Sequence, residues 1–264
     1  MTTLKVFVIN LKRSPERFEV IKQQLDNQNI NFERFNAVDG AELKDFTENF
    51  NLKRFSLESM HDLVPGEAGC SWSHIHLWEK IRSEKIDHAL VLEDDVVLTD
   101  RLKAFLSDKD NYKDFDYLKL DNTSKDIAEA LHCNESEITK HTIDVWKKNE
   151  YHLYEVDPVP YATGGYIISN KAALTFLKAS KNMYYPIDLL PRYTFPYTRQ
   201  GVVTPALIAH LNNESNIEAR TYNTSNEQNR LITIYNKINN KRRFRQISVL
   251  FTKLVRIIFR KSNV

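Results

Sequence analysis

The sequence predicts an α/β fold with a mostly parallel central sheet that is covered by helices on both faces. Short runs rich in β-branched and other apolar residues alternate along the chain with segments whose apolar residues recur at helical spacing. The chain has 264 residues and a hydrophobic fraction of 42%, which is enough for one large domain with a filled core. We expect this domain over residues 1–226 and a basic helical tail over residues 227–264.

The first strand and helix are expected at the N-terminus. Leu4–Asn10 contains an apolar run that is too short to cross a bilayer, and it predicts a buried strand. A helix should follow, because Ser14 is a suitable N-cap and Pro15 fits the first helical turn. Phe32–Val38 predicts the second strand, which Asp39 and the glycine after it would end.

The next part of the chain predicts one long helix and two strands. Residues 41–68 mix charged and aromatic side chains with Pro65-Gly66, and we expect a loop-rich excursion with a short helix there. Ser73–Arg82 has apolar residues at helical spacing, whereas His88–Leu92 has the continuous apolar run of a buried strand. Tyr117–Leu120 predicts a further strand.

The later part of the chain is less uniform in its signals. Residues 121–150 are polar, their pattern is ambiguous between helices and strands, and we expect a mobile segment. Ala162–Ser169 predicts a strand, in which Gly164 and Gly165 indicate a close backbone approach or unusual dihedral angles. Lys171–Ala179 predicts a helix.

Charge is distributed unevenly along the chain. The net charge is +2, yet the stretch from Lys237 to the end holds nine basic and no acidic residues, which leaves 28 basic against 35 acidic residues elsewhere.

Within this stretch six apolar residues fall on one helical face: Ile247, Leu250, Phe251, Leu254, Val255 and Ile258. Such a helix suits an anionic membrane surface, where each cation contributes about 1 kcal/mol. The alternatives are packing on the body of the protein or against a second copy in a homodimer. Nucleic-acid binding would leave the apolar face unexplained, and we expect no such partner.

The two cysteines, Cys70 and Cys133, form no pair at metal-ligand spacing. No stretch of the sequence resembles a secretory signal, so we expect reduced thiols and a cytoplasmic location.

Three consecutive acids, Glu93-Asp94-Asp95, follow directly after an apolar run. Adjacent carboxylates repel one another, and at the end of a buried strand a bound divalent cation would offset that repulsion. Mg²⁺ and Mn²⁺ prefer oxygen ligands, and ligands of open α/β sheets bind at the carboxyl ends of the strands. The competing interpretation is a solvated acidic turn that caps the next helix.

Five blocks of sequence, in order from about residue 4 to about residue 218, resemble glycosyltransferase family 25. That family includes lipooligosaccharide and lipopolysaccharide galactosyl- and glucosyltransferases of Gram-negative bacteria and is related to collagen galactosyltransferases. The blocks are Ile9-Asn10-Leu11-Lys12-Arg13-Ser14-Pro15-Glu16-Arg17, Gly66-Glu67-Ala68-Gly69-Cys70-Ser71-Trp72-Ser73-His74, Leu90-Val91-Leu92-Glu93-Asp94-Asp95, Tyr161-Ala162-Thr163-Gly164-Gly165-Tyr166-Ile167-Ile168-Ser169 and Pro186-Ile187-Asp188-Leu189-Leu190-Pro191.

The resemblance implies a GT-A catalytic domain over residues 1–226 and an inverting transfer from UDP-galactose or UDP-glucose, which forms a β-linkage to a lipid-linked outer-core sugar. The enzyme would then act peripherally on the inner face of the inner membrane. The acidic triplet would serve as the DXD motif, with Asp95 on the Mn²⁺ or Mg²⁺ ion and Glu93 on the metal, its bound water or the ribose. His210 is a third candidate ligand, with an ordinary core or surface histidine as the alternative.

Several other residues belong to the nucleotide site that the resemblance implies. Their amide, guanidinium, carboxylate and imidazole groups suit a uracil edge, a ribose or a diphosphate, and the glycines would let the backbone approach the ligand. They are Asn10, Leu11, Arg13, Arg17, Asp39, His74, Asp94, Gly164 and Gly165. A solvated helix position for Arg17 and a simple Asp-Gly turn at Asp39 are the alternatives.

Asp188 is the expected catalytic base. It lies between Pro186 and Pro191 in an apolar setting suited to raising a carboxyl pKa, and an inverting transfer needs a carboxylate to take the acceptor proton. A helix N-cap is the alternative role. Four tyrosines in this region would either stack on an acceptor sugar or pack against one another: Tyr184, Tyr185, Tyr193 and Tyr197.

Overall fold

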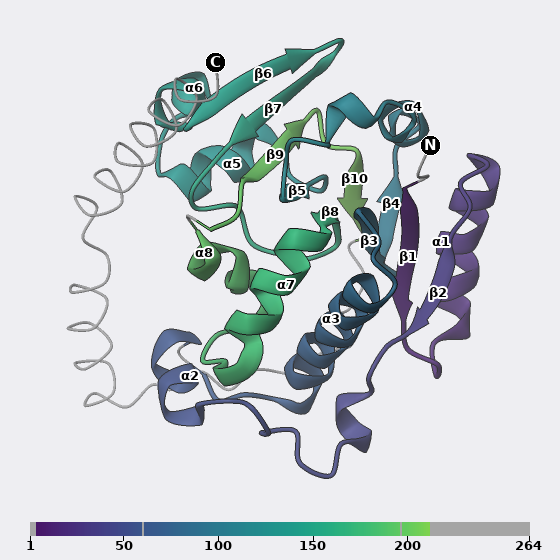
Figure 1. The fold of residues 1–264 in the computed structure, drawn as a ribbon, viewed down its shortest axis with the longest axis vertical. Coiled ribbons are helices and arrows are strands. Elements are labelled where there is room, and N and C mark those ends of the chain that lie inside the picture. The colour runs from purple at the N-terminus through teal and green to yellow at the C-terminus, as the bar shows by residue number, and fades with distance from the viewer. Residues whose placement is uncertain (1–3, 60, 196, 212–264) are drawn as a thin grey trace.

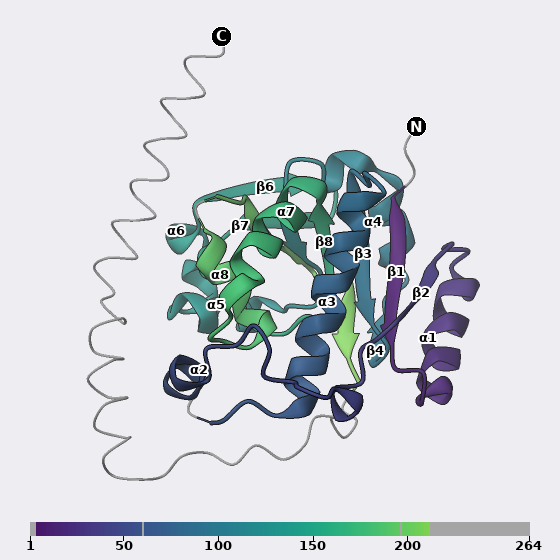
Figure 2. The same ribbon diagram turned by 60° about the horizontal axis from the view of Figure 1, so that its bottom comes forward.

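A computed structural model describes residues 4–59, 61–195 and 197–211. Their elements form three layers, with a large sheet between two sets of helices (Figure 1, Figure 2). The expected tail over residues 227–264 and the domain boundary after residue 226 lie outside the described residues. Among the described residues no helix is both long and apolar enough to cross a membrane.

The central sheet has eight strands in the order β2-β1-β3-β8-β5-β9-β7-β6. Six strands run in one direction, and only β7 and β8 run in the other, so the predicted α/β fold with a mostly parallel sheet is confirmed. The strands are β1 (Lys5–Asn10), β2 (Glu33–Asn36), β3 (His88–Glu93), β5 (Tyr117–Lys119), β6 (Asp144–Lys148), β7 (Tyr151–Glu155), β8 (Gly165–Ser169) and β9 (Gln200–Thr204). A separate antiparallel pair joins β4 (Val96–Leu98) to β10 (Ile208–His210).

Helices cover both faces of the sheet. One face packs against α1 (Pro15–Asn27) and α4 (Arg101–Ser107). The other packs against α3 (Pro65–Ser83), α5 (Ser124–Leu131) and α7 (Asn170–Ala179), of which α3 and α7 lie side by side in front of the sheet in Figure 1.

The alternation of side chains along β3 explains why two separate apolar cores form. Ala89 and Val91 face the core under α3, whereas Leu90 and Leu92 face the core under α1 and α4. All four are fully buried, and each large aliphatic side chain buried in this way contributes about 1.5–3 kcal/mol. A strand that is buried on both faces therefore shows the continuous apolar run seen in the sequence.

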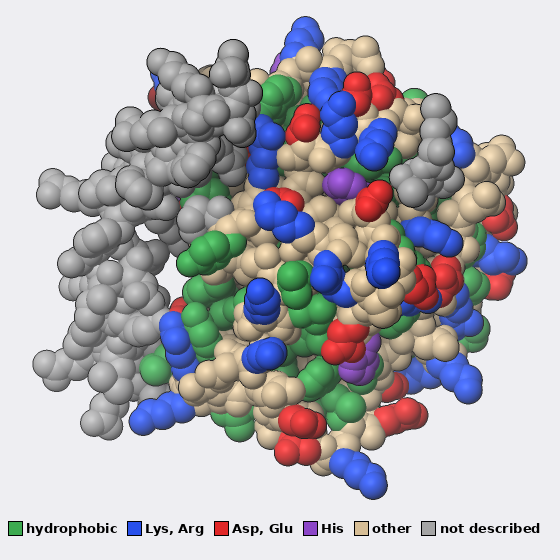
Figure 3. Space-filling model, in the orientation of Figure 1, with side chains coloured by type: hydrophobic (Ala, Val, Ile, Leu, Met, Phe, Trp, Pro, Cys, Tyr) green, Lys and Arg blue, Asp and Glu red, His purple; other side chains and the backbone are tan. Residues whose placement is uncertain are grey.

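Shorter elements connect these layers. The remaining helices are α2 (Leu52–Ser59), α6 (Ile138–His141) and α8 (Leu190–Thr194), and the 3-10 turns are η1 (Gly40–Glu42), η2 (Lys109–Asn111), η3 (Glu135–Glu137), η4 (Ser180–Asn182) and η5 (Ile187–Leu189). On the face drawn in Figure 3, Lys and Arg side chains are interspersed with Asp and Glu.

Two local expectations differ from the structure. Ser14 precedes α1 as predicted, but its side chain makes no capping hydrogen bond. The helix predicted from Ser73 begins at Pro65, because Gly69 lets it pack against the turn at Gly40: a Cβ on Gly69 would lie 2.6 Å from the Gly40 nitrogen. Residues 121–150, whose sequence pattern is ambiguous, contain α5, η3, α6 and the hairpin strand β6.

Candidate active site

The carboxyl ends of β1 and β3 lie next to each other and open into one cavity. The two strands are parallel neighbours, with Ile9 opposite Glu93, so the side chains that follow them meet at one edge of the sheet. The cavity has a volume of about 210 Å³. Its lining comes from these strand ends, the start of α1, the segment after β2 and the first turns of α3: Ile9, Leu11, Arg13, Arg17, Ala37, Val38, Asp39, Gly40, Gly66, Cys70, Ser73, His74, Glu93, Asp94 and Asp95.

The acidic triplet lines this cavity. Burial raises the pKa of Asp94 and of Asp95, and the neighbouring carboxylates add to the effect. Arg17 counteracts it, with its Nη1 atom 3.6 Å from Oδ1 of Asp94 and 3.9 Å from Oδ2 of Asp95. Oδ1 of Asp95 is buried and has no hydrogen-bond partner among the described residues. An acceptor of this kind, preceded in the chain by two further carboxylates, suits a hard divalent cation.

Asn10 holds Asp94 in place. Its Nδ2 atom donates to Oδ2 of Asp94 at 2.5 Å and to the Ser14 carbonyl at 2.9 Å. Its Oδ1 atom accepts from Arg34, so the whole amide is engaged in hydrogen bonds. Asn10 therefore lies in the predicted site, where its visible contacts orient the triplet.

Asp39 and Arg13 form an ion pair at the mouth of the cavity. The hydrogen bond from Arg13 holds the pKa of Asp39 below its ordinary value, against the effect of partial burial. Asp39 also accepts a hydrogen bond of 3.1 Å from the Ala41 N–H, which caps η1. Asp39 thus belongs both to the Asp-Gly turn that the sequence suggested and to the residues that line the cavity.

His74 links α3 to the end of β3. Its Nδ1 atom lies 2.7 Å from the Tyr166 hydroxyl and its Nε2 atom lies 3.3 Å from Oε1 of Glu93. Burial works to raise the pKa of Glu93, but His74 and a hydrogen bond from Thr163 lower it below the ordinary value. The shift in the pKa of Glu93 is therefore opposite in direction to the shifts in the pKa values of Asp94 and Asp95.

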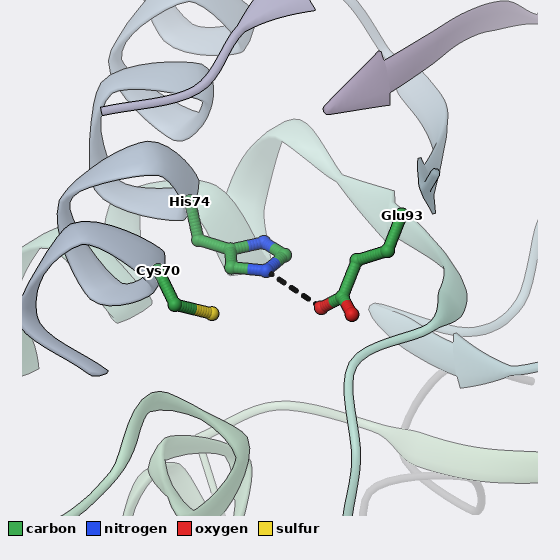
Figure 4. Close-up of side chains that lie close together, drawn as sticks. All are labelled: Cys70, His74 and Glu93. Atoms are coloured by element: carbon green, nitrogen blue, oxygen red, sulfur yellow. Dashed lines mark hydrogen bonds and ion pairs between the residues drawn. The ribbon is translucent and has the colours of Figure 1, made fainter. Parts of the chain in front are cut away.

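Cys70 lies in the same part of the cavity, and its thiol points toward the space between His74 and Glu93 (Figure 4). Donor atoms of these three residues all lie within 4.8 Å of one another, which is close enough for a shared metal ion. The set suits Mg²⁺ or Mn²⁺ poorly, because burial and nearby carboxylates raise the pKa of the Cys70 thiol well above its ordinary value. Both nitrogens of His74 also have partners already.

The segment between β7 and β8 lies against Glu93. Thr163 donates a hydrogen bond to Oε1 of Glu93, and the Gly164 carbonyl accepts one of 2.9 Å from the Glu93 N–H. Neither Gly164 nor Gly165 has a positive φ; that conformation belongs to Ala162, at 71°. A non-glycine residue there costs about 1–3 kcal/mol. Asp188 stabilises this backbone, since its Oδ2 atom accepts a hydrogen bond of 3.3 Å from the Ala162 N–H.

Asp188 does not cap a helix. It lies inside η5, whose N-cap is Pro186, and the following helix α8 has no side-chain cap. The negative charge of Asp188 helps to raise the pKa of the Cys70 thiol. The Asp188 carboxylate therefore lies near the cavity that Cys70 lines.

The two glycines are needed for close packing. A Cβ on Gly164 would lie 2.2 Å from Cε1 of His210, and a Cβ on Gly165 would lie 2.3 Å from a methyl carbon of Ile208. The close approach predicted from the sequence is therefore made to β10.

His210 is joined to a buried charge network that sequence analysis missed. Its Nε2 atom lies 3.1 Å from Oδ2 of Asp121, and this hydrogen bond, followed by the charges of Asp121, Glu93 and Asp95, raises the pKa of His210. Asp121 lies two residues after the end of β5, whose carboxyl end lies at the same edge as those of β1 and β3. Lys119 Nζ lies 3.4 Å from Oδ1 of Asp121, and both side chains are almost entirely buried. A lysine inside a predicted strand was the signal that could have revealed the network.

The tyrosines expected near the acceptor mostly pack against one another. Tyr185 and Tyr193 stack with their ring centroids 4.1 Å apart, and Tyr184 meets Tyr185 edge to face at 4.6 Å. Arg54 covers Tyr184, with its guanidinium carbon 3.3 Å from the ring centroid. Tyr197 is exposed.

Comparison with protein families gives one match to this chain. The model of glycosyltransferase family 25, described as an LPS biosynthesis protein, matches residues 3–191.

Relatives with this stretch occur in viruses, bacteria and animals. Protein R655 of Acanthamoeba polyphaga mimivirus is 32% identical over 67% of this chain and 53% of its own length. The lipooligosaccharide biosynthesis protein lic2B of Haemophilus influenzae is 34% identical over 39% of this chain and 37% of its own. Procollagen galactosyltransferase 2 of Mus musculus is 29% identical over 70% of this chain and 29% of its own. The chain thus spans about half the length of the mimivirus protein, and less of the other two.

Among solved structures, a glycosyltransferase involved in the glycosylation of the major capsid of PBCV-1 aligns with 80% of this chain and 95% of its own. The TM-score is 0.43 and the sequence identity is 13%.

Proposed function

The chain belongs to glycosyltransferase family 25, and from that premise we propose that it transfers galactose from UDP-galactose to an outer-core sugar of lipooligosaccharide or lipopolysaccharide. The transfer would invert the anomeric centre and form a β-linkage. UDP-glucose is the alternative donor, since the two sugars differ only in the orientation of the C4 hydroxyl. The observation that carries the proposal is the cavity at the ends of β1 and β3, which combines two arginines with three adjacent carboxylates.

The cavity has the groups that a nucleoside diphosphate requires. Arg13 and Arg17, at the start of α1, offer guanidinium donors to the diphosphate oxygens. Asp39 lies where a carboxylate could accept hydrogen bonds from the uridine, and Leu11 supplies apolar contact beside it. Asn10 would act indirectly, because its hydrogen bond fixes the position of Asp94.

A divalent metal ion fits the acidic triplet. Asp95 would be its main ligand, because Oδ1 of Asp95 is buried without a hydrogen-bond partner among the described residues. Glu93 and His210 could complete the set, since the charge of each acts on Asp95, whereas Cys70 and His74 suit Mn²⁺ or Mg²⁺ less well. When bound, the ion would offset negative charge on the departing UDP.

Asp188 is the proposed base. The acceptor hydroxyl oxygen would attack the anomeric carbon and form the new glycosidic bond as the bond from that carbon to the UDP oxygen breaks. The hydroxyl proton would pass to the Asp188 carboxylate, and UDP would leave with the bonding electron pair. The hydrogen bond from Ala162 fixes the orientation of this carboxylate at the cavity wall.

The proposed place of action is the inner face of the inner membrane of a Gram-negative bacterium, where a lipid-linked acceptor would be found. Membrane contact would come from the basic amphipathic stretch after Lys237, which lies outside the described residues.

A UDP-release assay with the purified protein tests the proposal. UDP-galactose and UDP-glucose are each supplied with Mn²⁺, Mg²⁺ or EDTA, with and without lipooligosaccharide acceptor. We expect metal-dependent release that the acceptor accelerates and that one donor supports better than the other. Release from neither donor in the presence of acceptor would refute the proposal.

A further inference from the structure

Tyr161 is an exposed aromatic residue close to the candidate site. Its side chain lies on the segment between β7 and β8, two residues before Thr163, which donates a hydrogen bond to Glu93. It is 58% exposed, which is a large exposed fraction for an aromatic residue. Ala162, the next residue, donates a backbone hydrogen bond to Asp188, so the segment that carries Tyr161 contacts both the proposed base and Glu93.

The backbone that carries Tyr161 is held in place by a buried cation. Lys119 Nζ donates to the Tyr161 carbonyl, to the Ala162 carbonyl at 2.5 Å and to the Pro160 carbonyl at 3.4 Å, while the lysine itself is 1% exposed. Ala162 has a φ of 71°, a conformation that is unfavourable for alanine and that its hydrogen bond to Asp188 helps to hold. A simple connection between two strands needs neither a buried lysine nor a left-handed alanine.

The ring of Tyr161 is also fixed from one side. The guanidinium carbon of Arg192 lies 3.8 Å from the ring centroid, and Nε of Arg192 donates to the Val159 carbonyl at 2.9 Å. One face of the ring therefore packs on a cation that is itself anchored to the same segment. The exposed fraction of the side chain leaves the opposite side of the ring to solvent. This is a rigid aromatic platform rather than a mobile surface tyrosine.

We propose that Tyr161 forms an acceptor subsite, in which the apolar C–H face of an acceptor pyranose stacks on the exposed face of its ring. A stacked sugar would be oriented relative to Asp188, because that carboxylate accepts a hydrogen bond from the residue next to Tyr161. The backbone of this one segment thus connects the platform with both the proposed base and Glu93. The inference rests on the proposed transferase activity and adds the surface that positions its second substrate.

The test compares three substitutions in the full-length enzyme. Y161F keeps the ring, Y161L keeps an apolar side chain without a ring, and Y161A removes both. With deacylated lipooligosaccharide as the acceptor, we expect Y161A and Y161L to raise the acceptor KM about tenfold, whereas Y161F stays near the wild type. The donor KM and the rate of UDP release without acceptor should not change. Leu174, which is 37% exposed on α7, provides a comparison with another exposed apolar side chain, and we expect L174A to change the acceptor KM much less.

Binding measurements distinguish failure of the subsite from failure of the proposed function. Saturation-transfer NMR in the presence of UDP detects which acceptor ring contacts the protein, with no need for turnover. Tyr161-dependent contact without any UDP release would refute the transferase proposal and leave the subsite standing. Normal transfer with an unchanged acceptor KM in Y161A would overturn the subsite, as would equal losses in Y161A and Y161F or a larger loss in L174A. If the wild type shows neither contact nor transfer, both proposals fall.

Discussion

The backbone N–H of Ala162 donates a hydrogen bond of 3.3 Å to Oδ2 of Asp188. The proposed base therefore has a second role, because the same carboxylate stabilises a left-handed residue in the segment that contacts Glu93. An asparagine would keep an oxygen that can accept from Ala162 but could not take a proton as a carboxylate does. The structural and the chemical roles of this side chain can thus be separated by the choice of substitution.

We expect D188N to bind donor normally and to transfer sugar about 10²–10⁴ times more slowly, since it removes the base and retains the backbone contact. D188A should lose the same rate and should also weaken acceptor binding, because Ala162 loses its partner. UDP release measures the rate, and calorimetry with UDP measures donor-site binding. Near-normal turnover in D188N would remove Asp188 as the base.

Replacement of Asp95 by asparagine tests the metal site. We expect D95N to lose the part of UDP affinity that depends on Mn²⁺ or Mg²⁺, because the substitution removes the negative charge of Asp95 and one of its two oxygens. UDP titrations with and without EDTA measure this part directly. Asp100 offers a matched control, since it is exposed, lies five residues away and makes no side-chain capping hydrogen bond. Equal metal dependence in D95N and D100N would contradict the assignment.

Removal of the buried Lys119 cation should destabilise the whole fold. K119M leaves the carboxylate of Asp121 without its cation and three carbonyl oxygens without their donor. Breaking a buried ion pair costs about 3–5 kcal/mol, which corresponds to a fall in Tm of roughly 6–20 °C for a chain of this size. The double variant K119M/D121N should lose less than K119M alone, because no unpaired charge remains.

Lys113 is the control for that experiment. Its side chain is exposed and pairs with Asp110 on the surface, so K113M should leave Tm unchanged. Equal Tm values for K119M and K113M would show that the buried network has no role in stability.

The closeness of the residues that follow β1 and β3 was predictable from the sequence for a simple reason. Buried parallel strands show as apolar runs, and the residues just after them must share one edge of the sheet, which is why Asn10 and Glu93 could be placed together. For Gly164 and Gly165 the sequence predicted only that another part of the protein comes close to their backbone. Which chain approaches, β10 in this structure, depends on tertiary packing.

Other features had weak or misleading local signals. Gly66 and Gly69 are poor helix formers, so the first turns of α3 were expected to be a loop, although packing against Gly40 requires a glycine there. Lys119 would ordinarily indicate a solvent-facing strand position, yet it is buried because Asp121 and three carbonyl groups surround it. The left-handed Ala162 has no signal in its own residue type, since its conformation is imposed by hydrogen bonds from elsewhere in the fold.

The basic stretch after Lys237 stays a prediction from sequence. Deletion of residues 241–264 should leave activity on soluble acceptors intact and weaken sedimentation with anionic liposomes, because the cations and the apolar face are both removed. A variant with Leu250, Leu254 and Ile258 changed to serine keeps every charge and should also bind less. Full liposome binding by both variants would refute membrane contact.

The pH dependence of stability should depend on His88, at the start of β3. Burial lowers the pKa of this imidazole below its ordinary value of 6.5, and the ring packs edge to face against Tyr112 at 5.8 Å. Above about pH 6.5 the ring is neutral in the folded and the unfolded chain, so its contribution to stability is complete. Below that pH the unfolded chain takes up a proton before the folded one, and stability is lost until the lower folded pKa is passed.

Substitution of phenylalanine for His88 keeps a ring against Tyr112 and removes the proton site. Between pH 6.5 and 5 the unfolding free energy of H88F, from urea titrations, should therefore fall less steeply than that of the wild type. His76 is exposed on α3, and H76F is the matched control that should follow the wild-type curve. If H88F and the wild type lost stability in parallel over this range, the buried histidine would not be the source of the dependence.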